Sequence, residues 1–204
     1  MNTVALSIGH SPRDGGAVMA DGSQSEYQYW LEHAPKIKRI LEQQYGISAV
    51  IVNRLVNGGG TTPGHAAAAC NATDAILAVD LHFNSFEPAS NGTETLCWYN
   101  SARGETAARH LQRAICECLG TRDRGIIYVC PDKRTEAIIA SSGVRADSSR
   151  AVSYFQKTRM AAIMIEPCFG GSNPGECRLL QDRADALCAA IAQGIAGAVK
   201  AIAA

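Results

Sequence analysis

The sequence lacks net charge, because nineteen Lys and Arg residues balance nineteen Asp and Glu residues over 204 positions. A protein whose main partner is nucleic acid needs a basic surface, since phosphate contacts supply most of the affinity. The composition therefore indicates no nucleic acid partner. The best basic cluster is a local one, around Arg122 and Arg124.

Targeting and membrane-spanning segments are also missing. The first residues, MNTVALSIGHSP, show no cationic stretch followed by a long apolar core, so we expect no secretory signal and synthesis in the cytoplasm. The longest weakly polar stretch, residues 186–199, contains Gln193 and is shorter than the roughly 20 residues that a membrane span needs. We therefore expect a soluble protein without stable membrane insertion.

Cysteines are present, but not in the patterns of a metal or disulfide scaffold. The eight cysteines, at positions 70, 97, 116, 118, 130, 168, 177 and 188, form no C-x-x-C pair. Cys116 and Cys118 are two positions apart on an expected helix, so they face different sides. We expect buried free thiols.

Apolar strand patterns alternate with helical ones along the chain. Strands are expected at 3–8, 47–54, 75–82, 93–99 and 161–165, and helices at 23–44, 63–73, 102–119 and from 174 onward. Pro35 should bend or restart the first helix, and Gly46 should end it in a left-handed conformation. Residues 124–158 are expected to mix a short strand, loops and a helix. The pattern predicts a single α/β domain over residues 1–204, with a mostly parallel or mixed twisted sheet of about six strands between helices.

Polar side chains follow the ends of three expected strands. His10 follows the first strand, His82 ends the third, and Glu166 ends the last, while Glu26 opens the first helix. Ligands gather at the carboxyl ends of strands in such sheets. Two histidines and a glutamate form a known catalytic zinc set that leaves a fourth position for water, and a second carboxylate can carry a proton from water to a leaving nitrogen. The sequence therefore predicts a zinc hydrolase site.

Each member of this set also has a structural interpretation. Glu26 follows Ser23 by three positions, so the two could form a capping box at the start of the helix. His82 could be a hydrogen-bonded core histidine. Glu166 favours a functional role, because an unpaired carboxylate in apolar surroundings is costly. Among the other histidines, His65 is a weaker candidate for capping a helix or lining the site.

The order of the motifs adds a resemblance to a known family. They are Gly9-His10, residues 14–17 (DGGA), Ser25-Glu26, Arg54, Cys70-Asn71, His82-Phe83-Asn84, residues 91–95 (NGTET), residues 123–125 (DRG) and residues 166–169 (EPCF) with Asn173. In this order the chain resembles the zinc-dependent N-acetylmuramoyl-L-alanine amidases of the amidase_3 type, which include phage and prophage endolysins and cut peptidoglycan.

The resemblance implies zinc ligands at His10, Glu26 and His82, and a catalytic acid/base at Glu166. The substrate would be the amide that joins N-acetylmuramic acid to L-alanine. Asn84 and Thr93 lie near these motifs and are candidates for positioning substrate, as is His65. Two departures from the family pattern stand out: Ser11-Pro12 replaces a pair of small residues, and residues 126–154, which in the family help to shape the substrate groove, align poorly.

Other functions stay open at this point. A zinc carboxypeptidase or endopeptidase acting on stem peptides would use the same metal. A muropeptide-recycling amidase or an autolysin would cut the same bond. A metal-free wall-binding protein is a further alternative. A nucleotide-binding loop at residues 56–65 is disfavoured, because His65 stands where a phosphate loop needs lysine. A catalytic domain that fills the chain is typical of an endolysin, which acts on the wall after release. The oligomeric state is not predicted.

Overall fold

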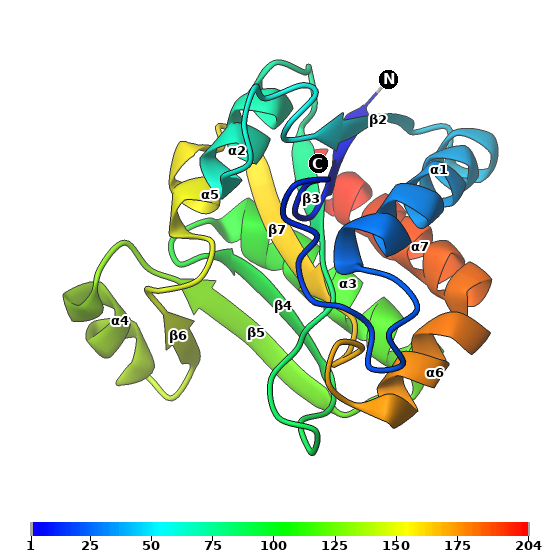
Figure 1. Ribbon diagram of the computed structural model, residues 1–204. Helices are drawn as coiled ribbons and strands as arrows, with labels where there is room; N and C mark the ends of the chain where they lie inside the picture. Colours follow the sequence, from blue (N-terminus) through cyan, green and yellow to red (C-terminus); the bar gives the residue numbers. More distant parts are fainter. Residues whose placement is uncertain (1, 204) are drawn as a thin grey trace.

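The computed structural model describes residues 2–203, which form a mixed sheet between two layers of helices (Figure 1). The sheet has the strand order β2-β1-β3-β7-β4-β5-β6. Its strands are β1 (Thr3–Ile8), β2 (Ser48–Asn53), β3 (Leu77–Leu81), β4 (Thr93–Trp98), β5 (Asp123–Val129), β6 (Arg145–Asp147) and β7 (Ala161–Glu166). Neighbouring strands are parallel except β4 and β7, which are antiparallel. The α/β fold predicted from the sequence is confirmed.

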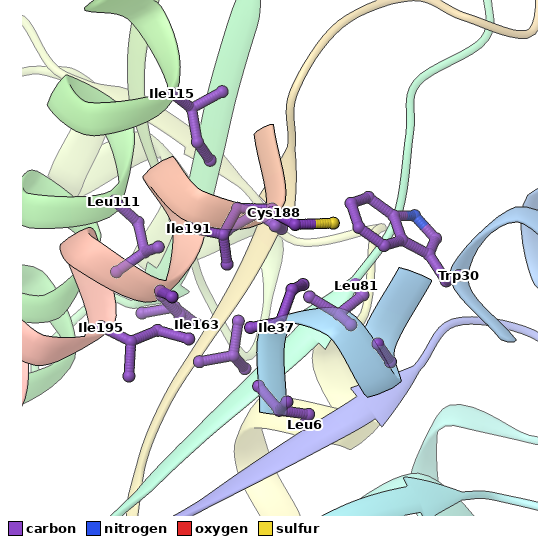
Figure 2. Close-up of a cluster of buried hydrophobic side chains, with 14 of the residues drawn as sticks. Leu6, Trp30, Ile37, Leu81, Leu111, Ile115, Ile163, Cys188, Ile191 and Ile195 are labelled. Atoms are coloured by element: carbon purple, nitrogen blue, oxygen red, sulfur yellow. The ribbon is translucent and has the colours of Figure 1, made fainter. Parts of the chain in front are cut away.

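Three long helices cover one face of the sheet. They are α1 (Glu26–Tyr45), α3 (Ala102–Leu119) and α7 (Ala184–Ala203). Figure 2 shows Trp30 and Ile37 of α1, and Leu111 of α3, beside Ile191 of α7, above apolar side chains of the sheet such as Leu6. The repeating apolar stripe of each helix is thus buried in a single core.

Shorter helices cover the opposite face. Here α2 (Pro63–Asn71) and α5 (Val152–Lys157) pack together over the sheet, and a second core of smaller side chains lies beneath them (Figure 1). The alanines of α2 allow this close approach. Helix α4 (Lys133–Ala140) lies beside β6 at the edge of the sheet and contributes no buried residue.

The structure corrects two expectations about helices. The helical region from Pro174 onward is two helices, α6 (Pro174–Asp182) and α7, because Arg183 between them leaves the helical conformation, with φ −113° and ψ 17°. Pro35 does not restart α1, which runs through it with Pro35 on the exposed side. Gly46 does end α1 in the left-handed conformation, with φ 63°. The segment 124–158 supplies two strands, so the sheet has one strand more than expected.

By length and composition alone, α7 could cross a membrane. Its apolar side chains, among them Leu187, Ile191 and Ile195, are instead buried in the first core, where α7 packs mainly against α3 and α1. This arrangement is typical of a core helix. The eight cysteines are all free, and six of them are buried, as the sequence predicted.

The candidate site residues lie on one side of the sheet, where strands end. Strands β1, β3 and β7 run parallel and end there. Since β4 is antiparallel to β7, it begins at this edge, and β5 and β6, parallel to β4, begin there too. Because β2 is parallel to β1, the carboxyl ends of four strands and the amino ends of three others lie on this side of the sheet.

Candidate active site

His10 lies on a tight loop that follows β1. The backbones of Ser11 and Asp14 bond to each other in both directions, at 2.9 and 3.1 Å, and close a turn around Pro12. His10 itself adopts φ 62°, a conformation that non-glycine residues rarely take. Ser11 and Pro12, which depart from the family pattern, thus belong to a closed turn that holds His10 at the carboxyl end of β1.

Glu26 does not cap its own helix. Ser25 is the N-cap of α1 and accepts from the Gln28 amide, and the Gln28 side chain accepts from the Ser25 amide in return, so the capping box is Ser25–Gln28. The Ser23–Glu26 capping box considered from the sequence is therefore wrong. The buried Glu26 carboxylate accepts from the backbone amides of Ala17 and Phe83 instead, at 3.2 and 3.1 Å.

His82 follows β3, and its ring lies between two carboxylates. Its Nδ1 is 2.7 Å from Glu26 Oε1, and its Nε2 is 3.1 Å from Asp80 Oδ2. Gly9 leaves room for this ring, because a Cβ there would approach His82 Cε1 to 2.7 Å. Asp80 thus holds one nitrogen of the His82 ring, and the other nitrogen faces Glu26. A histidine that only fills space in the core would need neither carboxylate.

His10 completes the cluster. Its Nε2 is 3.4 Å from Glu26 Oε2, and its ring meets that of His82 edge to face at 5.0 Å. One ligand atom each from His10, Glu26 and His82 lies within 4.8 Å of the others. Two imidazole nitrogens and a carboxylate oxygen are a donor set that zinc prefers. The residues present therefore fit a zinc ion.

Electrostatics support a cation at this cluster. Burial by itself raises the pKa of Glu26, but the imidazoles of His82 and His10 outweigh it and lower the pKa to about 2. Burial favours the neutral form of His82, yet Asp80 and Glu26 together raise its pKa well above the usual value. The carboxylates of Glu26 and Asp80 are thus ionised around a protonated His82, and a divalent cation would replace the proton on this imidazole.

Glu166 ends β7, immediately beside the end of β3. The two strands are in register from Leu77–Ala161 to Leu81–Ile165, and the His82 amide donates to the Ile165 carbonyl at 3.2 Å. The Glu166 carboxyl is buried, and its Oε2 has no hydrogen-bond partner among the described residues. Burial raises the pKa of Glu166 to about 8. A carboxyl with this pKa can both accept and release a proton near neutral pH.

The three further candidates from the sequence lie in different surroundings. Asn84 is half-buried near the site, and its amide donates to Glu94 at 2.8 Å. Thr93 is fully buried, with its hydroxyl bonded to the Pro167 carbonyl. His65 has its Nδ1 2.7 Å from the Thr62 hydroxyl at the start of α2. Asn84 therefore follows His82 by two residues with its side chain on Glu94, while Thr93 and His65 have hydrogen-bonding roles elsewhere.

Sequence reasoning missed Asp80 and Glu94. Asp80 is fully buried inside β3, and an aspartate within the apolar run AILAVDL was a signal that could have found it. Glu94 is 1% exposed in β4 and bonds to arginines from residues 124–150, a segment in which the sequence predicted a strand, loops and a helix without their positions. Its partners could be identified only from the fold.

Comparisons with known proteins agree with this fold. A search of the curated proteins finds no significant match. Among solved structures, the catalytic domain of the amidase CwlV from Bacillus (Paenibacillus) polymyxa has a TM-score of 0.71 at 24% identity, over 100% of this chain and 98% of that one. The amidase AmiC2 of Nostoc punctiforme has a TM-score of 0.69 at 20% identity, over 100% and 98%. The catalytic domain of an endolysin targeting Clostridia difficile has a TM-score of 0.67 at 15% identity, over 98% of both chains.

These structural similarities, all under 25% identity, show the fold. The family follows from the sequence itself, because the model of the N-acetylmuramoyl-L-alanine amidase family matches residues 4–200. The chain belongs to the N-acetylmuramoyl-L-alanine amidase family and is an amidase that acts on peptidoglycan.

Proposed function

We propose that the protein is a zinc-dependent amidase that cuts the bond between the lactyl group of N-acetylmuramic acid and the L-alanine of the stem peptide. His10, Glu26 and His82 hold the zinc, and Glu166 is the catalytic acid/base. The observation that carries this proposal is the convergence of His10, Glu26 and His82 within 4.8 Å, with Glu166 at the end of the adjoining strand.

The zinc ligands and Glu166 have different roles in the proposed reaction. When bound, zinc lowers the pKa of a coordinated water and polarises a carbonyl oxygen. In its ionised form Glu166 accepts the proton of the attacking water, and burial, which raises its pKa to about 8, makes it a stronger base than an exposed carboxylate. It then donates this proton to the leaving nitrogen of L-alanine. Asp80 holds the far nitrogen of His82, which fixes the orientation of the ring.

Two related activities compete with this proposal. A zinc peptidase would cut within the stem peptide, and a muropeptide-recycling amidase would cut the same bond in soluble fragments. We favour cleavage of the intact wall, since the chain belongs to the N-acetylmuramoyl-L-alanine amidase family and an endolysin domain is among the proteins that share its fold.

The products of digestion test the proposal. Purified protein with its zinc content measured is incubated with intact sacculi, and the soluble products are analysed by mass spectrometry. We expect stem peptides with a free L-alanine amino terminus, loss of activity with a chelator, and recovery with added zinc. Shortened peptides still attached to N-acetylmuramic acid would indicate a peptidase. Cleavage of soluble muropeptides without release from sacculi would indicate a recycling enzyme.

A further inference from the structure

Three arginines surround the buried carboxylate of Glu94. Arg124 Nε lies 2.9 Å and Arg145 Nη2 3.0 Å from Glu94 Oε2, while Nη1 and Nη2 of Arg150 both lie 3.0 Å from Glu94 Oε1. Asn84 adds a further donor to Oε1. We call Arg124, Arg145 and Arg150 the arginine cluster.

The cluster holds more positive charge than Glu94 needs. The one other carboxylate that bonds to it is Asp147, 3.0 Å from Arg150 Nε, so among the described residues three guanidiniums face two carboxylates. Each guanidinium has five N–H donors, and these contacts use only part of them. The side chains of Arg124, Arg145 and Arg150 are 27%, 43% and 36% exposed. Charged donors therefore remain available to solvent or to a ligand.

The cluster lies directly beyond the catalytic carboxyl. Glu94 and Glu166 are direct partners in the antiparallel pairing of β4 with β7. Such partners point to the same face of a sheet with their Cβ atoms about 5 Å apart. The charges of Arg150 and Glu166 also interact. The order along the edge of the sheet is thus the zinc cluster, then Glu166, then the arginine cluster.

This order places the arginine cluster on the peptide side of the substrate. Since Glu166 gives its proton to the leaving nitrogen, the peptide lies on the side of Glu166 away from the zinc cluster. The acyl side of the scissile amide leads to an N-acetylated sugar, whereas the peptide side has carboxylates within one or two residues. An extended peptide advances about 3.5 Å per residue, so these groups can reach past Glu166.

We infer that the arginine cluster, chiefly Arg145 and Arg150, binds a free carboxylate of the stem peptide one or two residues beyond the scissile amide. The enzyme then prefers peptides with this carboxylate free over peptides in which it is amidated. This inference rests on the proposed amidase function, because it uses the direction in which the substrate crosses Glu166. Guanidinium groups suit the role, since their planar donors match a carboxylate bidentately.

A purely structural role for the arginines makes a different prediction. If they only joined β5 and β6 to β4, their removal would lower stability and would affect charged and neutral substrates alike. A subsite for a carboxylate makes the effect of each arginine depend on the charge of the substrate.

The test uses a matched pair of synthetic substrates and the zinc-loaded enzyme. One is an N-acetylmuramoyl dipeptide whose second residue has a free α-carboxylate, and the other is its primary amide. For the wild type we expect kcat/KM to be roughly tenfold or more higher for the acid, which is the scale of one charge-assisted hydrogen bond. In Arg145→Gln and in Arg150→Gln the ratio of the two kcat/KM values falls toward one, mainly through slower turnover of the acid.

Two further variants serve as controls. Arg145→Lys keeps the charge and should retain part of the preference for the acid. Arg39→Gln removes an exposed arginine of α1 that lies outside the arginine cluster, and it should leave the ratio at the wild-type value. Equal hydrolysis of both substrates by the wild type, or an unchanged ratio in both Gln variants, would overturn the inference and leave the proposed function standing. Hydrolysis of neither substrate would overturn the proposed function and the inference with it.

Discussion

The proposed role of Glu166 depends on its surroundings, because the same carboxyl in water would have a pKa near 4.5 and not about 8. We expect Glu166→Gln to lower kcat by roughly 10²- to 10⁴-fold, since Gln keeps the shape but cannot transfer the proton. Zinc content should stay at the wild-type value. Hydrolysis of sacculi and metal analysis on the same preparation check this. Glu117→Gln, on the exposed side of α3, is the matched control. A variant at position 166 that keeps most of its rate with zinc bound would contradict the assigned role.

Asp80 would act on the proposed zinc through His82 and not by direct contact. Its carboxylate bonds to His82 Nε2, which leaves Nδ1 as the nitrogen for zinc. Partners of this kind typically change metal affinity by about 10- to 100-fold, so we expect Asp80→Asn to weaken zinc binding by this factor. Competition with a chromophoric chelator measures it on protein whose fold is checked by circular dichroism. Asp74→Asn, in an exposed position just before β3, should bind zinc as the wild type does.

The sequence predicted the residues of the cluster better than their partners. His10, His82 and Glu166 could be found because each follows a strong apolar strand, and strand ends gather at one edge. The role of Glu26 was ambiguous, since residues 23–28 (SQSEYQ) satisfy a capping pattern at two registers, Ser23–Glu26 and Ser25–Gln28. Only the fold shows that Ser25 and Gln28 take the caps and free Glu26. Long-range pairing also decides the partners of Glu94, so no local pattern could reveal them.

At the scale of elements, the loop between β1 and α1 must stay close to the zinc cluster. Gly16 has φ 75°, and a Cβ there would approach His10 Cδ2 to 2.5 Å and Glu26 Oε2 to 2.7 Å. Gly22, in the same connection, has φ 76°, and a Cβ added there would meet no atom within 4 Å. Both Gly16→Ala and Gly22→Ala should lose about 1 kcal/mol or more of stability from the left-handed backbone.

Only Gly16→Ala should also weaken zinc binding, because only its methyl group displaces two ligands. Thermal unfolding and zinc titration of the two variants side by side separate backbone strain from damage to the site. Equal zinc affinity in both variants would show that the loop adapts without disturbing His10 and Glu26.

Glu94 joins β4 to the segments that carry the three arginines, and its ionisation should make this junction sensitive to pH. Burial alone raises the pKa of Glu94, but Arg124, Arg150 and Arg145 outweigh it and lower the pKa to about 2. A carboxylate with a lowered pKa stabilises the fold above its unfolded pKa of about 4.5, and this contribution is lost as pH falls toward about 2.

We therefore expect Glu94→Gln to be less stable than the wild type by about 2 kcal/mol at pH 7, the scale of a hydrogen bond to a charged group. The difference should shrink as pH falls from 5 toward 3, because the unfolded wild type then takes up a proton on Glu94 while the folded protein, in which the pKa is about 2, does not. Urea unfolding at several pH values measures both. A difference that stays constant over this range would mean that the charge of Glu94 contributes nothing to stability.

The parts of the fold that the sequence did not predict lie where helical and strand signals are weak. Strand β6 has three residues, too few for alternation to be read, and β5 begins with charged residues. The break between α6 and α7 occurs at Arg183 without proline or glycine, so it follows from packing and not from local propensity. Long, strongly apolar elements such as β1, α3 and β7 were predicted to within one or two residues.

At the scale of the whole molecule, zinc should bind the folded chain far better than the unfolded one. Its three proposed ligands come from positions 10, 26 and 82 and meet only when β1, α1 and β3 are assembled. A ligand present at 100 times its Kd stabilises the native state by about 2.7 kcal/mol, which corresponds to a rise in Tm of roughly 5–10 °C for a chain of this size. Differential scanning fluorimetry with and without added zinc measures this shift.

The variant His82→Ala should lose most of the shift, since two ligands alone bind zinc weakly. His110→Ala removes an exposed histidine of α3 outside the cluster and should keep the shift in full, which controls for weak binding to surface histidines. A shift of the same size in His82→Ala would place the stabilising zinc elsewhere on the molecule. Because stabilisation and catalysis draw on the same three ligands, the zinc concentration that restores half of the activity should also produce half of the bound protein in a titration.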